Sequence, residues 1–232
     1  MSTLTFKVVG TTLFGVDVDP YVQEIAEILE VINISTHELR ALLTLIPWLP
    51  TPHNRRSHDA VRRLDRIVYG LINARRASGE QRNDILDRLL AARDEVDGTG
   101  MDEKQIRDEV VTLLLAGHET SANALLWTFE QIARYPEVEA RLLAELQTEL
   151  QGRPALSADL ARLPYLKQVV QETMRLRPPV WAIARRSHQD EIFQGCRVAA
   201  GAYLMIMPYM LHRHRDFWPD PLVFDPERFN PR

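Results

Sequence analysis

The spacing of apolar residues predicts that most of this chain is helical. Apolar side chains recur every three or four positions along much of its length, which is the period of a helix with one buried face. Boundary signals agree with this pattern: Asp102 and Gln105 form a capping-box arrangement, and Pro136 suits a first helical turn. The predicted helices cover residues 1–15, 20–38, 54–77, 84–93, 102–135, 136–151 and 164–176.

A different pattern near the C-terminal end predicts a small β element. Short apolar runs at residues 194–198 and 203–207 flank Gly201, as expected for short strands separated by a turn. Three prolines between residues 46 and 52 predict a loop, because proline does not fit the interior of a helix. The predicted fold class is therefore mainly α with a small β element, in one domain over residues 1–232.

Composition narrows the classes of function. The 232 residues include 28 Lys+Arg and 32 Asp+Glu, a formal charge of −4, which gives no reason to expect nucleic-acid binding. No apolar run approaches the roughly 20 residues of a membrane span. Cys196 is the one cysteine, so no disulfide can form within the chain, and a reducing, cytoplasmic location is expected.

The centre of the segment 102–135 combines features that are unfavourable in a plain helix. Residues 110–116 are apolar on all sides, which predicts burial all round. Gly117 costs about 1 kcal/mol relative to alanine inside a helix, and Glu119 and Thr120 place polar groups beside the apolar stretch. Either the glycine leaves a gap where a flat ligand lies against the backbone, or it admits a neighbouring helix.

Three charged residues form a second candidate feature. Glu172 and Arg175 are spaced i to i+3 on one helix face, and Arg228 lies in a proline- and aromatic-rich tail. One interpretation is a surface ion pair that contributes little. In the other, one glutamate held between two arginines ties the tail to the helix.

Together, these motifs resemble the cytochrome P-450 superfamily. Ala-Gly-x-Glu-Thr at 116–120, Glu-x-x-Arg at 172–175 followed by Pro-Pro, and Pro-Glu-Arg-Phe at 226–229 occur in that order. Each motif is modest, whereas the ordered set is specific, and the resemblance covers essentially the whole chain. It implies a haem-dependent monooxygenase acting on an apolar small molecule, with electrons from a ferredoxin or flavoprotein reductase.

The resemblance also implies roles for individual residues near the cofactor. Thr120, with Glu119 beside it, would sit near bound dioxygen and help to deliver protons. Ala116 and Gly117 would lie against the porphyrin. Residues 180–183 would face the substrate.

Further roles concern the haem propionates and the framework. Arg185 and His212 would meet the propionates of the haem. Glu172, Arg175 and Arg228 would form the structural triad of the family.

One departure from the family pattern concerns the iron ligand. The family uses a cysteine thiolate in a segment after the Pro-Glu-Arg-Phe motif, and this sequence ends at Arg232. We therefore expect a partial P-450 domain, without the N-terminal helices or the cysteine loop. No metal ligand is predicted, and Cys196 is interpreted as a packing or surface residue.

The departure leaves several functional hypotheses open. The fragment is expected to be inactive alone. The alternatives are a non-catalytic helical binding module, one half of a split enzyme, or a gene product that never folds.

Overall fold

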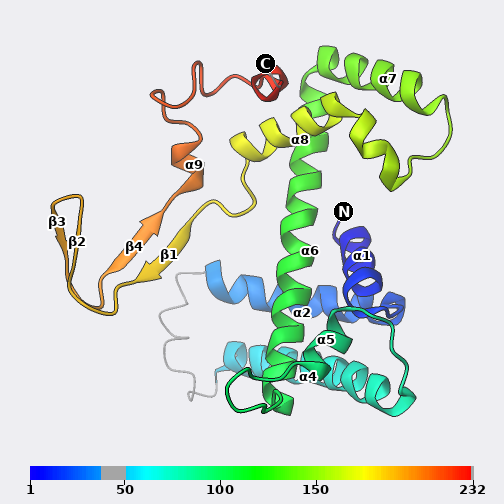
Figure 1. Ribbon diagram of the computed structural model, residues 1–232, viewed down its shortest axis with the longest axis vertical. Coiled ribbons are helices and arrows are strands. Elements are labelled where there is room, and N and C mark those ends of the chain that lie inside the picture. Colours follow the sequence, from blue (N-terminus) through cyan, green and yellow to red (C-terminus); the bar gives the residue numbers. More distant parts are fainter. Residues whose placement is uncertain (38–50, 231–232) are drawn as a thin grey trace. The chain divides into compact units, whose positions relative to one another are not determined.

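The structure is a computed structural model that describes residues 1–37 and 51–230, and only the backbone of residues 32–37 and 53. The predicted loop at 46–52 lies mostly outside these residues. The chain packs as two compact units, Ser2–Glu119 and Thr120–Arg232, the latter with Met1. The longest element, α6 (Glu103–Arg134), contributes residues to both (Figure 1).

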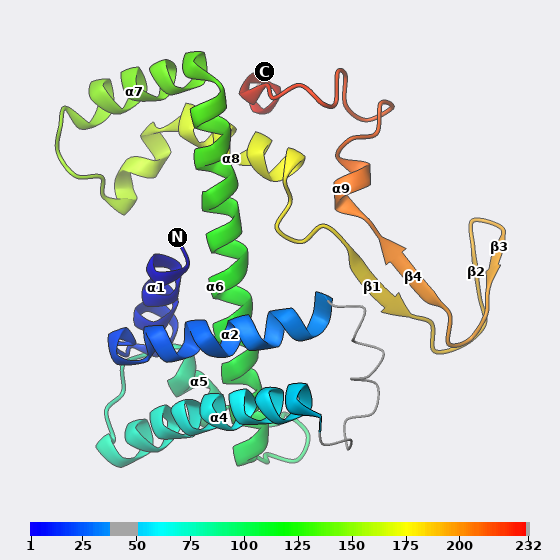
Figure 2. The same cartoon turned by 180° about the vertical axis from the view of Figure 1, so that it is seen from behind.

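The Ser2–Glu119 unit contains mostly the helices expected from the apolar pattern. Its helices α2 (Val22–His37) and α4 (Pro52–Ser78) lie side by side (Figure 2). Large apolar side chains from all its helices, including Phe14, Ile28, Ile72 and Leu114, form one buried core. Its elements are α1 (Ser2–Phe14), η1 (Asp19–Tyr21), α2 (Val22–His37), α4 (Pro52–Ser78), α5 (Ile85–Ala91) and the first part of α6.

Local signals determine where α6 begins. The predicted capping box is present: the Gln105 N–H donates to Asp102 Oδ1 at 2.7 Å, and the Asp102 N–H donates to Gln105 Oε1 at 2.8 Å. These two bonds satisfy backbone donors that the first helical turn leaves free. The prediction for this boundary is therefore confirmed.

The expected all-round burial of residues 110–116 in α6 is wrong within the part of the chain that the structure describes. Ile106, Val110, Leu114 and His118 are buried at four-residue intervals, whereas Ala116 is exposed. The core of this unit covers one face of the helix only. An apolar sequence indicates what a helix can bury, and the neighbouring elements decide which face is covered.

A buried cation connects three helices of the same unit. Arg75 of α4 donates to both carboxylate oxygens of Asp84, at 2.9 and 2.7 Å, and to the Phe14 carbonyl at the end of α1 at 2.7 Å. Asp84 in turn caps α5 by accepting the N–H of Asp87 at 3.0 Å. The bidentate pair and the carbonyl contact therefore join the end of α1 and the start of α5 to α4.

The Thr120–Arg232 unit begins with helices, continues with short strands and ends in mostly irregular chain. Tyr135 stacks on Phe224 with ring centroids 5.1 Å apart, and Val169 and Leu176 belong to the same buried cluster. The 3-10 turn η3 (Pro226–Phe229) therefore packs on the helices of this unit. The other helical elements are α7 (Pro136–Leu150), η2 (Ser157–Arg162), α8 (Pro164–Leu176) and α9 (Pro208–Leu211).

The β element consists of two antiparallel strand pairs. β1 (Ile183–Arg186) pairs with β4 (Tyr203–Ile206), and β2 (Glu191–Phe193) pairs with β3 (Cys196–Val198). The two predicted strands exist, but each pairs with an earlier strand and not with the other. β1 was not predicted, because it carries two arginines and has no apolar run.

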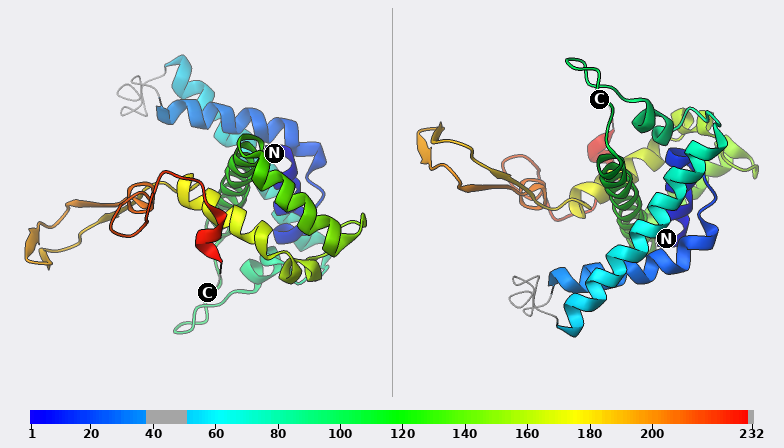
Figure 3. Two further views of the ribbon diagram at one scale, coloured as in Figure 1. Left: turned by 90° about the horizontal axis from the view of Figure 1, so that it is seen from above. Right: turned by 90° about the horizontal axis from the view of Figure 1, so that it is seen from below.

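The predicted start of the first strand at residue 194 is also wrong. Gln194 and Gly195 have positive φ angles of 48° and 80° and form the two-residue turn between β2 and β3, as hairpin twist favours. The resulting hairpin extends beyond the β1–β4 pair (Figure 3). Within residues 1–37 and 51–230, no helix has both the length and the apolarity needed to cross a membrane.

Candidate functional site

Glu172 and Arg175 form a buried ion pair on α8. Arg175 Nε lies 2.6 Å from Glu172 Oε2, and Arg175 Nη2 lies 2.7 Å from Glu172 Oε1. Their side chains are 0% and 1% exposed. The interpretation as a surface pair is therefore wrong, because both groups have left water and depend on each other for charge compensation.

The remaining donors of Arg175 bind the chain that follows the strands. Arg175 Nη1 donates to the carbonyls of His212 and Pro221, each at 2.7 Å, and Nη2 donates to the carbonyl of Val223 at 3.1 Å. All five guanidinium N–H groups are thus used. The guanidinium also stacks 5.1 Å from the Trp218 ring centroid. One side chain consequently holds three separate points of the irregular segment against α8.

Arg228 lies on the other side of the same carboxylate. Its Nε is 3.4 Å from Glu172 Oε1, within ion-pair distance, although it has no hydrogen-bond partner among the described residues. Its other nitrogens donate to the carbonyls of Pro219 and Asp220. The Asp225 N–H donates to Glu172 Oε1 at 2.9 Å. One glutamate therefore lies between two arginines, in the arrangement that the sequence suggested.

The helix α6 continues without interruption through the Ala-Gly-x-Glu-Thr segment. A Cβ placed on Gly117 would lie 3.2 Å from Val9 Cγ2 of α1, so this glycine accommodates a helix crossing. Of the two interpretations, the geometry favours the crossing at Gly117 itself. Ala116 and Glu119 are exposed and Thr120 is half-buried. Ala116 and Thr120 lie one turn apart on the same helix face.

His118, between these residues, was missed by the sequence reasoning. His118 is 7% exposed, and its ring meets Phe6 edge to face with centroids 5.7 Å apart. Its Nδ1 has no hydrogen-bond partner among the described residues. Burial lowers the pKa of His118, opposed by the charge of Glu119 and a backbone contact with Ser2. Its position four residues after Leu114 was the signal that could have revealed its burial.

The two predicted propionate contacts differ in availability. Arg185 is exposed on β1, and Nη1 donates to the carbonyl of Ala184 at 2.9 Å. His212 Nδ1 lies 3.2 Å from the Arg175 carbonyl oxygen, which can only accept, so this nitrogen carries the proton. The His212 ring also meets Trp218 edge to face. Arg185 is thus available to an anionic ligand, whereas His212 is partly committed to the Arg175 cluster.

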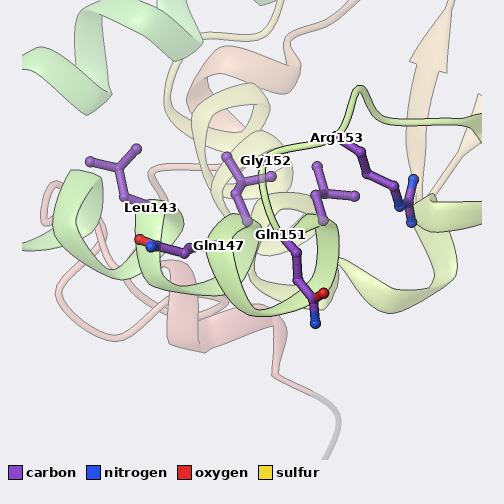
Figure 4. A pocket seen from close by; sticks show the side chains of 7 residues that line it. Leu143, Gln147, Gln151, Gly152 and Arg153 are labelled. Carbon is purple, nitrogen blue, oxygen red and sulfur yellow. The ribbon is translucent and has the colours of Figure 1, made fainter.

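A pocket of about 700 Å³ lies beside the C-terminal part of α7 (Figure 4). Leu143, Gln147, Gln151 and Gly152 line it, together with Arg153. Arg153 forms two hydrogen bonds of 2.7 Å with Asp159. The pocket contains none of the predicted site residues, and its one charged group is already neutralised. We therefore assign it no chemistry.

The geometry can be compared with known proteins. Residues 1–232 match the family described as Cytochrome P450. Cyclooctatin synthase of Streptomyces melanosporofaciens is 38% identical over 100% of this chain and 51% of its own length. Pentalenene oxygenase of Streptomyces avermitilis is also 38% identical, over 79% of this chain and 40% of its own length. Retinoic acid-bound cyanobacterial CYP120A1 gives a TM-score of 0.84 at 30% identity, covering 99% of this chain and 51% of that one.

A mainly helical fold with a buried Glu-x-x-Arg pair thus coincides with a match along the whole sequence. The chain belongs to the cytochrome P450 family. It spans about half the length of the curated relatives it matches.

Haem is the cofactor of this family, and residues of this chain fit it in part. The exposed guanidinium of Arg185 suits a propionate carboxylate, and Ala116 presents a small exposed side chain on α6. Cys196, the one cysteine, does not fit the role of the thiolate ligand to the haem iron. It is exposed on β3 beside the hairpin turn. No chemical step at the iron is therefore derived from these residues.

Proposed function

We propose that residues 1–232 form part of a haem-dependent monooxygenase that inserts one oxygen atom of dioxygen into an apolar organic substrate. The observation that carries this proposal is the family match over the whole chain. Pentalenene oxygenase and cyclooctat-9-en-7-ol 5-monooxygenase, two relatives, are named for oxygenation. Electrons would come from a ferredoxin or flavoprotein reductase, and the expected location is the cytoplasm.

The α6 residues would act on the distal side of the haem. When bound, the haem supplies the iron at which dioxygen is reduced. Thr120 would hold a hydrogen-bonded proton near the oxygen, and the exposed carboxylate of Glu119 would exchange protons with water. Ala116 would leave room for the porphyrin by its small exposed side chain, whereas Gly117 beside it accommodates Val9 of α1.

The remaining predicted residues would position the cofactor. Arg185 would bind one propionate, and His212 would approach the other through the ring nitrogen that does not face Arg175. Glu172, Arg175 and Arg228 would act as the structural triad, because their contacts hold the segment from residue 212 to residue 228 against α8.

We further propose that residues 1–232 alone do not catalyse this reaction, because their one cysteine is exposed on a hairpin. A carbon monoxide difference spectrum of the purified, haem-supplemented chain tests this. The expected Soret band is that of haem without a thiolate ligand. A thiolate-type band would contradict the proposal, and its loss in Cys196→Ser would assign the thiolate to Cys196.

A second candidate is one half of a split enzyme or a helical binding module. The exposed apolar side chains of β4 and α9 favour a partner polypeptide: Tyr203, Met205, Ile206 and Met210 are 74%, 55%, 49% and 60% exposed. Co-purification with a polypeptide carrying Phe-x-x-Gly-x-Arg-x-Cys would support the split enzyme. A stable monomer that does not take up haem would support the binding module.

A further inference from the structure

A second pocket in the Thr120–Arg232 unit is lined mainly by aromatic rings and methionine side chains. It has a volume of about 570 Å³, within the range of sites that bind small molecules. It lies between the C-terminal half of α6, the chain that follows α8, and the start of α9. Its lining includes Trp127, Trp181, Tyr209, Met207, Met210 and Arg177. Flat rings and flexible thioethers suit a planar ligand.

The charge at this pocket is not balanced. The Arg177 guanidinium lies 4.7 Å from the Trp127 ring centroid and makes no hydrogen bond or ion pair within the described residues. Arg213 lies 3.7 Å from the centroid of Tyr209, and among the residues that the structure describes its nitrogens donate only to the carbonyls of Tyr209 and Leu176. Two half-buried cations thus adjoin an aromatic pocket without a carboxylate partner of their own.

The buried carboxylate of α8 is already bound to another arginine. Glu172 is held by both Nε and Nη2 of Arg175. Burial, and then the positive charges of Arg177 and Arg175, lower the pKa of Arg213 against an opposing effect of Tyr209. An anion in this pocket would relieve a repulsion that the described residues leave in place.

We propose that this pocket binds a planar aromatic carboxylate, with its rings against the two tryptophans and its carboxylate on Arg177. The planar donor fork of arginine matches a carboxylate, and the indole rings supply the stacking surface. The site requires no haem, so this proposal can be tested independently of the monooxygenase proposal.

Calorimetry on the haem-free chain, with 2-naphthoate and its neutral counterpart 2-naphthamide, tests the site. We expect 2-naphthoate to bind at least about tenfold more tightly, since a charge-assisted pair is stronger than a neutral one. Arg177→Gln should weaken 2-naphthoate binding by about tenfold and leave 2-naphthamide unchanged. Arg215→Gln removes an exposed arginine that does not line the pocket and should change neither affinity.

The proposal is overturned if the two compounds bind equally, if Arg177→Gln binds 2-naphthoate like the parent chain, or if no saturable binding occurs. If Arg177→Gln does not fold, the comparison of 2-naphthoate with 2-naphthamide on the parent chain still tests the proposal. Raising the salt from about 0.05 M to about 0.5 M should weaken 2-naphthoate binding only. Equal salt sensitivity of both compounds would contradict an arginine–carboxylate contact.

Discussion

Arg175 holds Glu172 through two parallel hydrogen bonds of 2.6 and 2.7 Å, with both side chains removed from water. The same guanidinium binds the carbonyls of His212, Pro221 and Val223. The pair therefore connects α8 to a segment about 40 residues further along the chain. Its energetic importance follows from burial, because removing one partner leaves the other charged and uncompensated.

Replacing Glu172 by glutamine should strongly destabilise the chain. The substitution leaves Arg175 buried without its counter-charge, which costs about 3–5 kcal/mol. The free energy of unfolding from urea titration, followed by far-UV circular dichroism, measures the change. Arg62→Gln is a matched control, because Arg62 and Asp59 have the same i, i+3 spacing with side chains 73% and 60% exposed. It should change stability by less than about 1 kcal/mol. If Glu172→Gln and Arg62→Gln lowered the free energy of unfolding equally, burial would not be the cause of the large contribution of the α8 pair.

Substitutions at two helical glycines should change the stability of the chain in opposite directions. Gly70 in α4 has nothing within 4 Å of an added Cβ, so Gly70→Ala should stabilise the chain by about 0.5–1 kcal/mol. Gly117→Leu should destabilise it by about 1–3 kcal/mol, because the new side chain meets Val9 of α1. Thermal melting measures both, and Val9→Ala should restore part of the loss at Gly117. A neutral Gly117→Leu would instead support an open gap at this position.

Stability should decline in acid through His118. Burial lowers the pKa of His118 below its ordinary value of 6.5, so the unfolded chain binds the proton more readily. The free energy of unfolding should therefore fall as the pH drops from about 6.5 toward the folded-state pKa, and level off below it. His118→Phe keeps a ring against Phe6 and should remove this decline. Urea titrations between about pH 5 and pH 8 measure it, with the exposed His188→Gln as control. An unchanged slope in His118→Phe would refute the assignment.

Protonation of Asp159 should produce a second decline in the free energy of unfolding, at lower pH than that of His118. Hydrogen bonds from Arg153, the Leu156 N–H and Arg162 hold the pKa of Asp159 far below its usual range. The contribution of Asp159 to the free energy of unfolding is therefore complete above the pKa of aspartate in the unfolded chain, about 4. It is lost as the pH falls toward the pKa of Asp159 in the folded chain. Asp159→Asn should be less stable than the parent chain at pH 6 and should show a shallower fall in acid. Parallel curves for the two proteins would contradict this prediction.

Much of the local structure could be predicted from neighbouring residues. The i, i+3 and i+4 repeats located the helices, and Asp102 with Gln105 located the start of α6, because these interactions lie within one helical turn. β1 could not be predicted, since Ile183–Arg186 becomes a strand only by pairing with Tyr203–Ile206. The burial of His118 likewise depends on Phe6, more than 100 positions away.

A comparison of two ion pairs with i, i+3 spacing shows what the sequence alone cannot predict. Asp59–Arg62 and Glu172–Arg175 have the same spacing, and spacing determines only that the side chains can meet. The ordered motifs were sufficient to place the chain in the cytochrome P450 family. Which pair loses its water depends on whether a distant segment packs over it. Tertiary packing covers Glu172 and Arg175 and leaves Asp59 and Arg62 in solvent, and electrostatic interactions strengthen where water is excluded.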